Sequence, residues 1–229
     1  MEDFEPSEID DYPVGSPHDA ELIAADVESK DFRGLLRKKH KPGKSTWRMI
    51  RVTEAHAIWI KGTHFPIANL IMESALARTW ADGSVASFRL CPQDYHRFHS
   101  PVNGIVKWWK HIPGDYYNVD PIALRSRVDI LSQNARSCLC ISSPEFGYVL
   151  FVAIGATGVA TIKFHENICG EGSRVVKGEE LGWFEFGGSS ILVVFESGRI
   201  HFDSDLIEAS EHVITVNVEV GMKRGSATQ

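Results

Sequence analysis

Short apolar runs, separated by turn-forming residues, make up most of the chain after residue 85. The runs are rich in β-branched and aromatic residues, and Gly, Pro, Asn and Asp lie between them. They cover residues 86–90, 104–109, 127–131, 136–142, 147–155, 158–164, 190–196, 198–202 and 212–219. Strands of this length and spacing predict a mainly β (α+β) fold, with short-stranded sheets packed as a sandwich or a partly closed barrel.

One upstream segment follows a helical period instead. Apolar residues recur at positions 67, 70, 71, 75 and 76, and Pro66 suits the first turn of a helix. The pattern predicts an amphipathic helix over residues 66–80, so the fold should carry one or two helices near residues 64–80. We expect this helix to pack on the core. Residues 49–62 mix helical and strand periods and leave the element type open.

Composition limits the class of protein. The chain has 229 residues, 43% of them hydrophobic, which is enough for one sizeable core, and its formal charge of −6 argues against a nucleic-acid partner. The run Arg37 to Lys41 is the basic exception, and a solvated surface is the expected explanation. Residues 1–30 are acidic and poor in aromatics, so they predict a disordered extension to a single domain over residues 31–229.

The sequence also indicates a cell compartment. The chain begins with an acidic segment where a secretory signal would be basic, and its best apolar run, residues 147–162, is interrupted by Gly155 and Gly158. Cys138 and Cys140 would share one face of a strand, as buried reduced thiols. These features predict an intracellular protein, cytoplasmic or peripheral to an internal membrane.

A serine after two glycines is the first candidate for chemistry, in the segment Phe186-Gly187-Gly188-Ser189-Ser190. One interpretation is a hairpin turn, in which glycine supplies positive φ between strands 181–186 and 190–196. The other is a nucleophile: the Ser189 hydroxyl attacks the Gly188 carbonyl and forms an ester, and elimination leaves a pyruvoyl group. The pattern alone does not exclude either interpretation.

Two histidines in the segment Asp94-Tyr95-His96-Arg97-Phe98-His99-Ser100-Pro101 are the second candidate. No carboxylate or cysteine completes a metal site at a suitable spacing, so no metal is expected. Each imidazole is either a structural group or a general base toward Ser189. In Trp108-Trp109, strand alternation would put one ring in the core and leave one partly exposed, and a membrane-surface anchor is the alternative.

Taken in order along the chain, several segments resemble the phosphatidylserine decarboxylases, a self-processing, pyruvoyl-dependent family. The matching segments are Lys39 to Gly43, Trp59 to Gly62, Phe88 to Gly104, Pro113 to Tyr117, Val119 to Pro121, Asn134 to Arg136, Gly155 to Thr157, and Lys177 to Gly182 leading into Gly187-Gly188-Ser189. Their common order makes the resemblance much more specific than the Gly-Gly-Ser alone.

The resemblance implies cleavage between Gly188 and Ser189, giving a β-chain of residues 1–188 and an α-chain of residues 189–229 that remain partners. Ser189 would become the covalent pyruvoyl cofactor, which acts as an electron sink. His99 would promote processing and His96 would serve decarboxylation. The implied substrate is phosphatidylserine at a membrane surface, and the products are phosphatidylethanolamine and CO₂. A homo-oligomer is left open.

Three departures from the family pattern keep alternatives open. The family places an Asp upstream of Trp59-Ile60-Lys61-Gly62 to orient the processing histidine, whereas this chain has no Asp between residues 32 and 81. Ser190 stands where Thr is usual, and Asn103 replaces a common Asp. The chain is therefore a shortened phosphatidylserine decarboxylase, a decarboxylase of a free aromatic amino acid, or an unprocessed, non-catalytic lipid-binding homologue.

Overall fold

A computed structural model describes most of the region that the strand pattern covers. The described residues are 31–33, 46–53, 58–60, 63–65, 67–90, 94–118, 129–156, 161–185, 189–212, 214–219 and 223–228. The predicted extension at residues 1–30, the basic run Arg37 to Lys41, and the residues Cys91, Gly187 and Gly188 lie outside them.

The elements confirm a mainly β protein with a few short helices. The strands are β1 (Asp31–Arg33), β2 (Thr46–Thr53), β3 (Ile58–Ile60), β4 (Thr63–Phe65), β5 (Ser84–Leu90), β6 (Arg97–His99), β7 (Gly104–Ile112), β8 (Arg136–Ser143), β9 (Gly147–Ile154), β10 (Thr161–Phe164), β11 (Arg174–Val175), β12 (Glu180–Glu185), β13 (Ser189–Phe195), β14 (Ile200–Phe202), β15 (Val216–Glu219) and β16 (Lys223–Ala227). The helices are α2 (Ile67–Ile71), α3 (Ser74–Ala77), the 3₁₀ turn η1 (Arg78–Trp80), α4 (Ile130–Gln133) and α5 (Ser204–Glu211).

Antiparallel pairing organises these strands into one large sheet and smaller ones. The main sheet has the order β11-β7-β8-β9-β13-β5-β2-β15. A second sheet, here named the β6 sheet, has the order β10-β12-β6, and β1-β16-β14 and β3-β4 form two more. The sheets are open, so of the two expected architectures the structure has packed sheets and no closed barrel.

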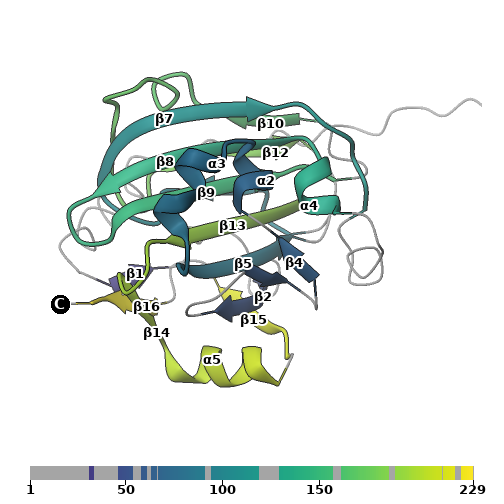
Figure 1. Ribbon diagram of the computed structural model, residues 1–229, viewed down its shortest axis with the longest axis vertical. Helices are drawn as coiled ribbons and strands as arrows, with labels where there is room; N and C mark the ends of the chain where they lie inside the picture. The colour runs from purple at the N-terminus through teal and green to yellow at the C-terminus, as the bar shows by residue number, and fades with distance from the viewer. Residues whose placement is uncertain are drawn as a thin grey trace, which may run out of the picture.

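The main sheet is the middle of three layers. Figure 1 shows α2, α3 and α4 over one of its faces, with β10 and β12 behind the other. The helix-side core contains Leu70, Ile71 and Trp80 against one set of strand residues. The interlayer core lies between the main sheet and the β6 sheet. It contains Phe98 and Phe184 of the β6 sheet, which pack against the main-sheet residues that point to the opposite face. Period-two alternation along each strand therefore supplies both cores.

Alternation accounts for two further predictions. Cys138 and Cys140 both lie in the helix-side core, as two residues of one strand face should. Trp108 packs against the helix-side core and Trp109 against the interlayer core. The predicted alternation of the two tryptophans is confirmed, although both rings are half-buried rather than one being wholly in the core.

One prediction of secondary structure is wrong. Residues 127–131 were expected as a strand, but the described part of that run leads into α4, whose Ile130 and Leu131 enter the helix-side core. The one or two helices expected near residues 64–80 are present, as α2 and α3 followed by η1, with Met72 between the first two at a φ of 53°. Strand β6 and helix α5 were not predicted.

The break after α2 has a physical cause in the main sheet. Arg136 of β8 donates from Nε to the Leu70 carbonyl at 2.6 Å and from Nη2 to the Asn69 carbonyl at 2.8 Å. Lys110 of β7 donates from Nζ to the Ile71 carbonyl at 3.2 Å. These side chains take up carbonyl groups that a longer helix would have used, and they fasten α2 to the sheet.

We predict that Arg136→Met lowers the free energy of unfolding by about 3 kcal/mol or more, because it leaves buried carbonyl acceptors unpaired. The Arg136 side chain also donates to the Asn134 carbonyl at 2.8 Å, and burial lowers the pKa of its guanidinium. Urea unfolding measures the change. Arg78→Met, at an exposed position of η1, is the control and should change stability by less than about 0.5 kcal/mol. Equal effects of the two variants would contradict the role of Arg136.

The buried thiols give a second prediction. Burial raises the pKa of Cys138 and Cys140 from 9.0 to about 12. The unfolded chain therefore loses these thiol protons at lower pH than the folded chain, so stability should fall as pH rises from about 9 to about 12. At about pH 8, iodoacetamide should modify neither thiol in the folded protein and both in denaturant. Peptide mapping would detect the modified residues, and Cys138 modified in the native state would contradict the prediction.

Candidate active site

Ser189 is the first residue of β13, one of the central strands of the main sheet. It is aligned with Leu90 of β5, while Ser190 is aligned with Ile154 of β9 on the other side. The Ser189 side chain is fully buried, and its Oγ has no hydrogen-bond partner among the described residues. Because Ile191 belongs to the interlayer core, alternation places Ser189 on the same side of the sheet.

The connection that leads into Ser189 joins two sheets. Strand β12 ends at Glu185 and pairs with β10 and β6, whereas β13 pairs with β9 and β5. The hairpin interpretation of residues 181–196 is therefore wrong, since its two strands are not partners. The Gly-Gly pair, which lies outside the described residues, falls in the sequence between a strand of the β6 sheet and a strand of the main sheet.

The edge of the main sheet around Ser189 is formed by strand ends. Strand β5 ends at Leu90 and β9 at Ile154, beside the point where β13 begins. The next residue of that edge, Gly155, donates its N–H to the Ala135 carbonyl at 2.9 Å. Segments that the sequence shares with the resembled family thus meet at one edge, although they are far apart along the chain.

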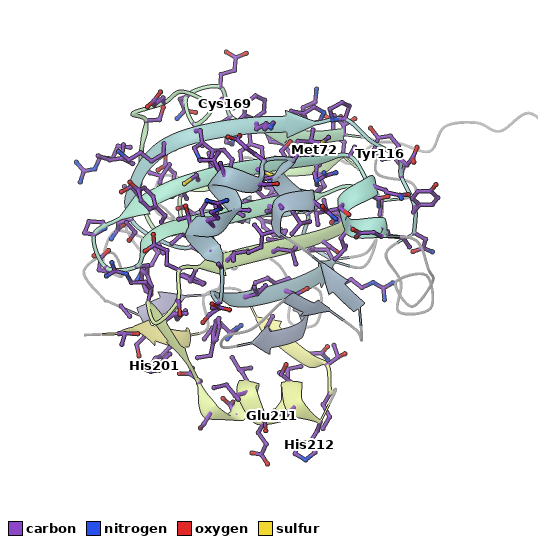
Figure 2. The ribbon with its side chains drawn as sticks, viewed as in Figure 1. Met72, Tyr116, Cys169, His201, Glu211 and His212 are labelled. Carbon is purple, nitrogen blue, oxygen red and sulfur yellow. The ribbon has the colours of Figure 1, made fainter. Side chains whose placement is uncertain are left out.

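Asn134 fastens a loop to this edge. Its side chain is fully buried, its Nδ2 donates to the carbonyls of Gly155 at 2.8 Å and Tyr117 at 2.9 Å, and its Oδ1 accepts from the Tyr117 N–H at 2.8 Å. Figure 2 shows Tyr116, the neighbouring residue, at the same end of the sheet, and its side chain is exposed. Sequence reasoning noted the Asn-Ala-Arg segment but not this role.

His96 precedes β6 and contacts the interlayer core. Its Nδ1 donates to the Asp94 carbonyl at 2.6 Å, and its ring lies edge-on to Phe184, with the ring centroids 6.4 Å apart. The N–H of Phe184 donates to the His96 carbonyl at 2.9 Å. His96 is therefore joined to the end of β12 that leads into residues 186–188 and Ser189.

His99 ends β6 and is almost wholly buried. Its Nδ1 donates to the Gly178 carbonyl at 2.8 Å, and its Nε2 lies 3.3 Å from the Tyr95 hydroxyl. Across the ladder it is aligned with Glu180. Both imidazoles thus lie in the layer that faces β13, but neither is hydrogen-bonded to Ser189 Oγ in the described structure.

A cluster of charged side chains stabilises this layer. The Glu180 carboxylate accepts from Arg97 of β6 at 2.5 Å and lies 2.9 Å from Nε2 of His165, which follows β10. The Arg97 guanidinium also lies 5.8 Å from the centre of the Trp183 ring. One carboxylate on β12 therefore joins the strands on both sides of it, and sequence reasoning did not single out this contact.

The described residues contain no cluster of three or more His, Cys, Asp or Glu side chains that could hold a metal ion. Among the described residues, the candidate groups that the sequence singled out for chemistry are the Ser189 hydroxyl and the two imidazoles. A hydroxyl and a base that is fixed through its other nitrogen are the components of a known arrangement for nucleophilic attack on a carbonyl, although no contact between them is seen among the described residues.

Comparison with known proteins assigns the chain to the family that its sequence segments, taken in order, resemble. The family model for phosphatidylserine decarboxylase matches residues 41–225. The chain belongs to the phosphatidylserine decarboxylase family. The match includes Ser189, both histidines and every described segment from β2 to β15, so the family resemblance predicted from the sequence is confirmed.

Similar proteins come from a plant, a yeast and a bacterium. Phosphatidylserine decarboxylase proenzyme 2 of Oryza sativa subsp. japonica is 44% identical over 179 residues, which are 78% of this chain and 28% of that protein. Phosphatidylserine decarboxylase proenzyme 2 of Saccharomyces cerevisiae is 42% identical over 76% of this chain and 15% of its own length. Phosphatidylserine decarboxylase proenzyme of Chlamydia muridarum is 39% identical over 72% of this chain and 54% of its own length. This family member thus spans about half of its bacterial relative and less of the other two.

Proposed function

We propose that this chain is a pyruvoyl-dependent phosphatidylserine decarboxylase that matures by cleaving its own backbone between Gly188 and Ser189. The observation that carries the proposal is the buried Ser189 hydroxyl, which has no hydrogen-bond partner among the described residues. Leaving such a group unpaired costs about 1–3 kcal/mol, so a fold that retains it calls for an explanation. A nucleophile that is consumed on maturation explains it, and the site fits a cofactor made from this residue.

Maturation starts with proton transfer from Ser189 Oγ to Nε2 of His99. The oxygen forms a bond to the carbonyl carbon of Gly188, the Gly188–Ser189 peptide bond breaks, and the proton passes to the leaving nitrogen. Loss of the Cα proton of Ser189 then breaks its Cβ–O bond and releases the Gly188 carboxylate. The dehydroalanine that remains takes up water and loses ammonia, which leaves a pyruvoyl group at the start of β13.

The position of Ser189 would keep the new group in place after cleavage. Strand β13 pairs with β5 from Ser189 to Phe195 and with β9 from Ser190 to Phe195. A chain of residues 189–229 would therefore stay bound between two neighbours in the middle of the main sheet. The new N-terminal group would remain buried between the layers, where water is scarce and electrostatic effects are strong.

When present, the pyruvoyl group supplies an electron sink for the bond that breaks as CO₂ leaves. His96 is the residue we assign to proton transfer in this step. Nδ1 of His96 donates to the Asp94 carbonyl, so we assign the proton transfer to its other ring nitrogen, Nε2. The edge-on contact with Phe184 fixes the orientation of the ring.

The substrate we propose is phosphatidylserine presented by a membrane surface, because the relatives are named for that activity. The products would be phosphatidylethanolamine and CO₂. No helix in the described part of the chain is long and apolar enough to cross a bilayer. Surface-exposed apolar side chains, among them Met72 and Tyr116 (Figure 2), would provide the contact with lipid.

We predict that the purified chain gives two masses under denaturing conditions and that Ser189→Ala gives one. The alanine removes the attacking oxygen but leaves the strand pairing of β13 intact, so the variant should fold. Intact-mass spectrometry should find a chain of residues 189–229 that begins with a pyruvoyl group. In native size-exclusion chromatography the two chains should elute together, since β13 is paired on both sides.

Ser190→Ala is the matched control, because Ser190 is also buried but follows the proposed cleavage point. It should still cleave. A single unprocessed mass for the unaltered chain, with no CO₂ release from phosphatidylserine vesicles, would mean a non-catalytic homologue. Cleavage followed by CO₂ release from tryptophan but not from phosphatidylserine would reassign the substrate to a free amino acid.

Substitution of the two histidines should affect maturation and turnover separately. His99→Ala should slow cleavage by roughly 10²–10⁴-fold, the usual contribution of a general base. His96→Ala should cleave normally and then release CO₂ from phosphatidylserine at a rate lower by a similar factor. Time courses on denaturing gels and radiolabelled CO₂ release measure the two steps. Normal cleavage in His99→Ala, or normal turnover in His96→Ala, would remove the corresponding assignment.

A further inference from the structure

His99 is held through Nδ1 by a main-chain carbonyl. Its Nδ1 lies 2.8 Å from the carbonyl oxygen of Gly178, and only 4% of the residue is exposed. A carbonyl oxygen can only accept a hydrogen bond, so the neutral ring must carry its proton on Nδ1. That tautomer leaves the lone pair on Nε2, which is the form that a general base requires.

The other nitrogen of His99 has a defined neighbour as well. The Tyr95 hydroxyl lies 3.3 Å from Nε2, and with Nδ1 protonated this hydroxyl is the donor, so it must release Nε2 before that nitrogen can accept a proton from Ser189. The two rings are stacked, with centroids 6.1 Å apart and planes inclined by 13°. Tyr95 thereby limits rotation of the imidazole and favours the same tautomer as the Gly178 carbonyl does.

The turn that presents the Gly178 carbonyl is fixed from several sides. Gly178 has a φ of 86°, a conformation that residues with a Cβ rarely adopt. Its N–H donates to the Ser100 carbonyl at 2.8 Å, and the N–H of Lys177 donates to Oδ1 of Asn103 at 2.8 Å. Because these bonds tie the turn to the segment just after His99, acceptor and imidazole keep one relative position.

We propose that the Gly178 carbonyl orients His99 for self-cleavage, in the place that a carboxylate occupies in serine-type triads. Gly178 is then a positioning residue for the general base, and it acts through its backbone, which explains how a chain without Asp between residues 32 and 81 can present a base to Ser189. This inference rests on the proposed function for the role of His99, while the tautomer itself can be measured without any cleavage.

The first test measures the tautomer in the full-length Ser189→Ala chain, which stays unprocessed. Long-range ¹H–¹⁵N correlation spectra at about pH 8 distinguish a protonated Nδ1 from a protonated Nε2. We expect His99 to be protonated on Nδ1 only. Protonation on Nε2 would overturn the inference, and neither result depends on whether the natural chain is an active enzyme.

The second test compares two glycine substitutions with the same backbone penalty. Gly178 and Gly172 both have a φ of 86°, and a Cβ at Gly172 would meet nothing within 4 Å. With Ser189 present, Gly178→Ala should slow cleavage by about 10²-fold, because a small displacement of a catalytic group has an effect of that size. Gly172→Ala should cleave at the natural rate with a similar loss of thermal stability.

Spectra separate positioning from general destabilisation. In the Ser189→Ala background, Gly178→Ala should show a mixture of His99 tautomers, and Gly172→Ala should retain the Nδ1-protonated form alone. Equal cleavage rates and equal spectra for the two variants would overturn the inference. If the natural chain does not cleave at all but His99 is protonated on Nδ1, the proposed function fails while the orientation of His99 by Gly178 stands.

Discussion

Burial of the start of β13 between two neighbouring strands is the constraint on which the site depends. The ladders to β5 and β9 fix the backbone of Ser189 and Ser190, so the Ser189 hydroxyl cannot turn toward solvent without breaking main-sheet pairing. The hydroxyl is held on the face of the main sheet that packs against the β6 sheet, away from water. A hydroxyl held in this way has few orientations open to it, which would favour the intramolecular attack proposed above.

The β6 sheet supplies the groups on the facing side. Phe98 anchors it, with ring centroids 5.5 Å from Phe151 of the main sheet and 5.1 Å from Phe184 of its neighbour β12. The residues on either side of this anchor are Arg97, paired with Glu180, and His99, bonded to Gly178. The buried Phe98 ring thus sets the depth at which its two polar neighbours lie. His96 precedes them in the chain and accepts a hydrogen bond from Phe184, near the end of β12 that leads to Ser189.

Sequence patterns predicted the features that depend only on residues close together in the chain. Alternation placed Cys138 and Cys140 on one face and separated Trp108 from Trp109, because the side-chain period of a strand does not depend on its partners. The family segments singled out Ser189 and both histidines as candidates, and all three lie within the residues that the family model matches. Glycines before a serine, however, suggested a hairpin, and sequence proximity cannot show that β12 and β13 belong to different sheets.

Other features that the sequence did not predict also arise from contacts between residues that are distant in sequence. The helix expected over residues 66–80 breaks because Arg136 and Lys110, on strands β8 and β7, take up its carbonyl groups. The Gly178 carbonyl and His99 are 79 positions apart, and a backbone acceptor has no side-chain signature at all. A search restricted to Asp therefore finds no orienting group for His99 between residues 32 and 81.

The location of the Gly-Gly-Ser segment also bears on why cleavage would be compatible with the fold. Strand β12 ends at Glu185 in one sheet and β13 begins at Ser189 in another, so a cut between Gly188 and Ser189 would leave both sheets with their own ladders. The layers would still be joined by the interlayer core, in which Phe98 and Phe184 pack with Ile191 and Val193. Apolar burial of this kind does not depend on an intact backbone. A break inside either sheet would instead free a strand edge, so a crossing between sheets is where the fold can best tolerate the loss of a peptide bond.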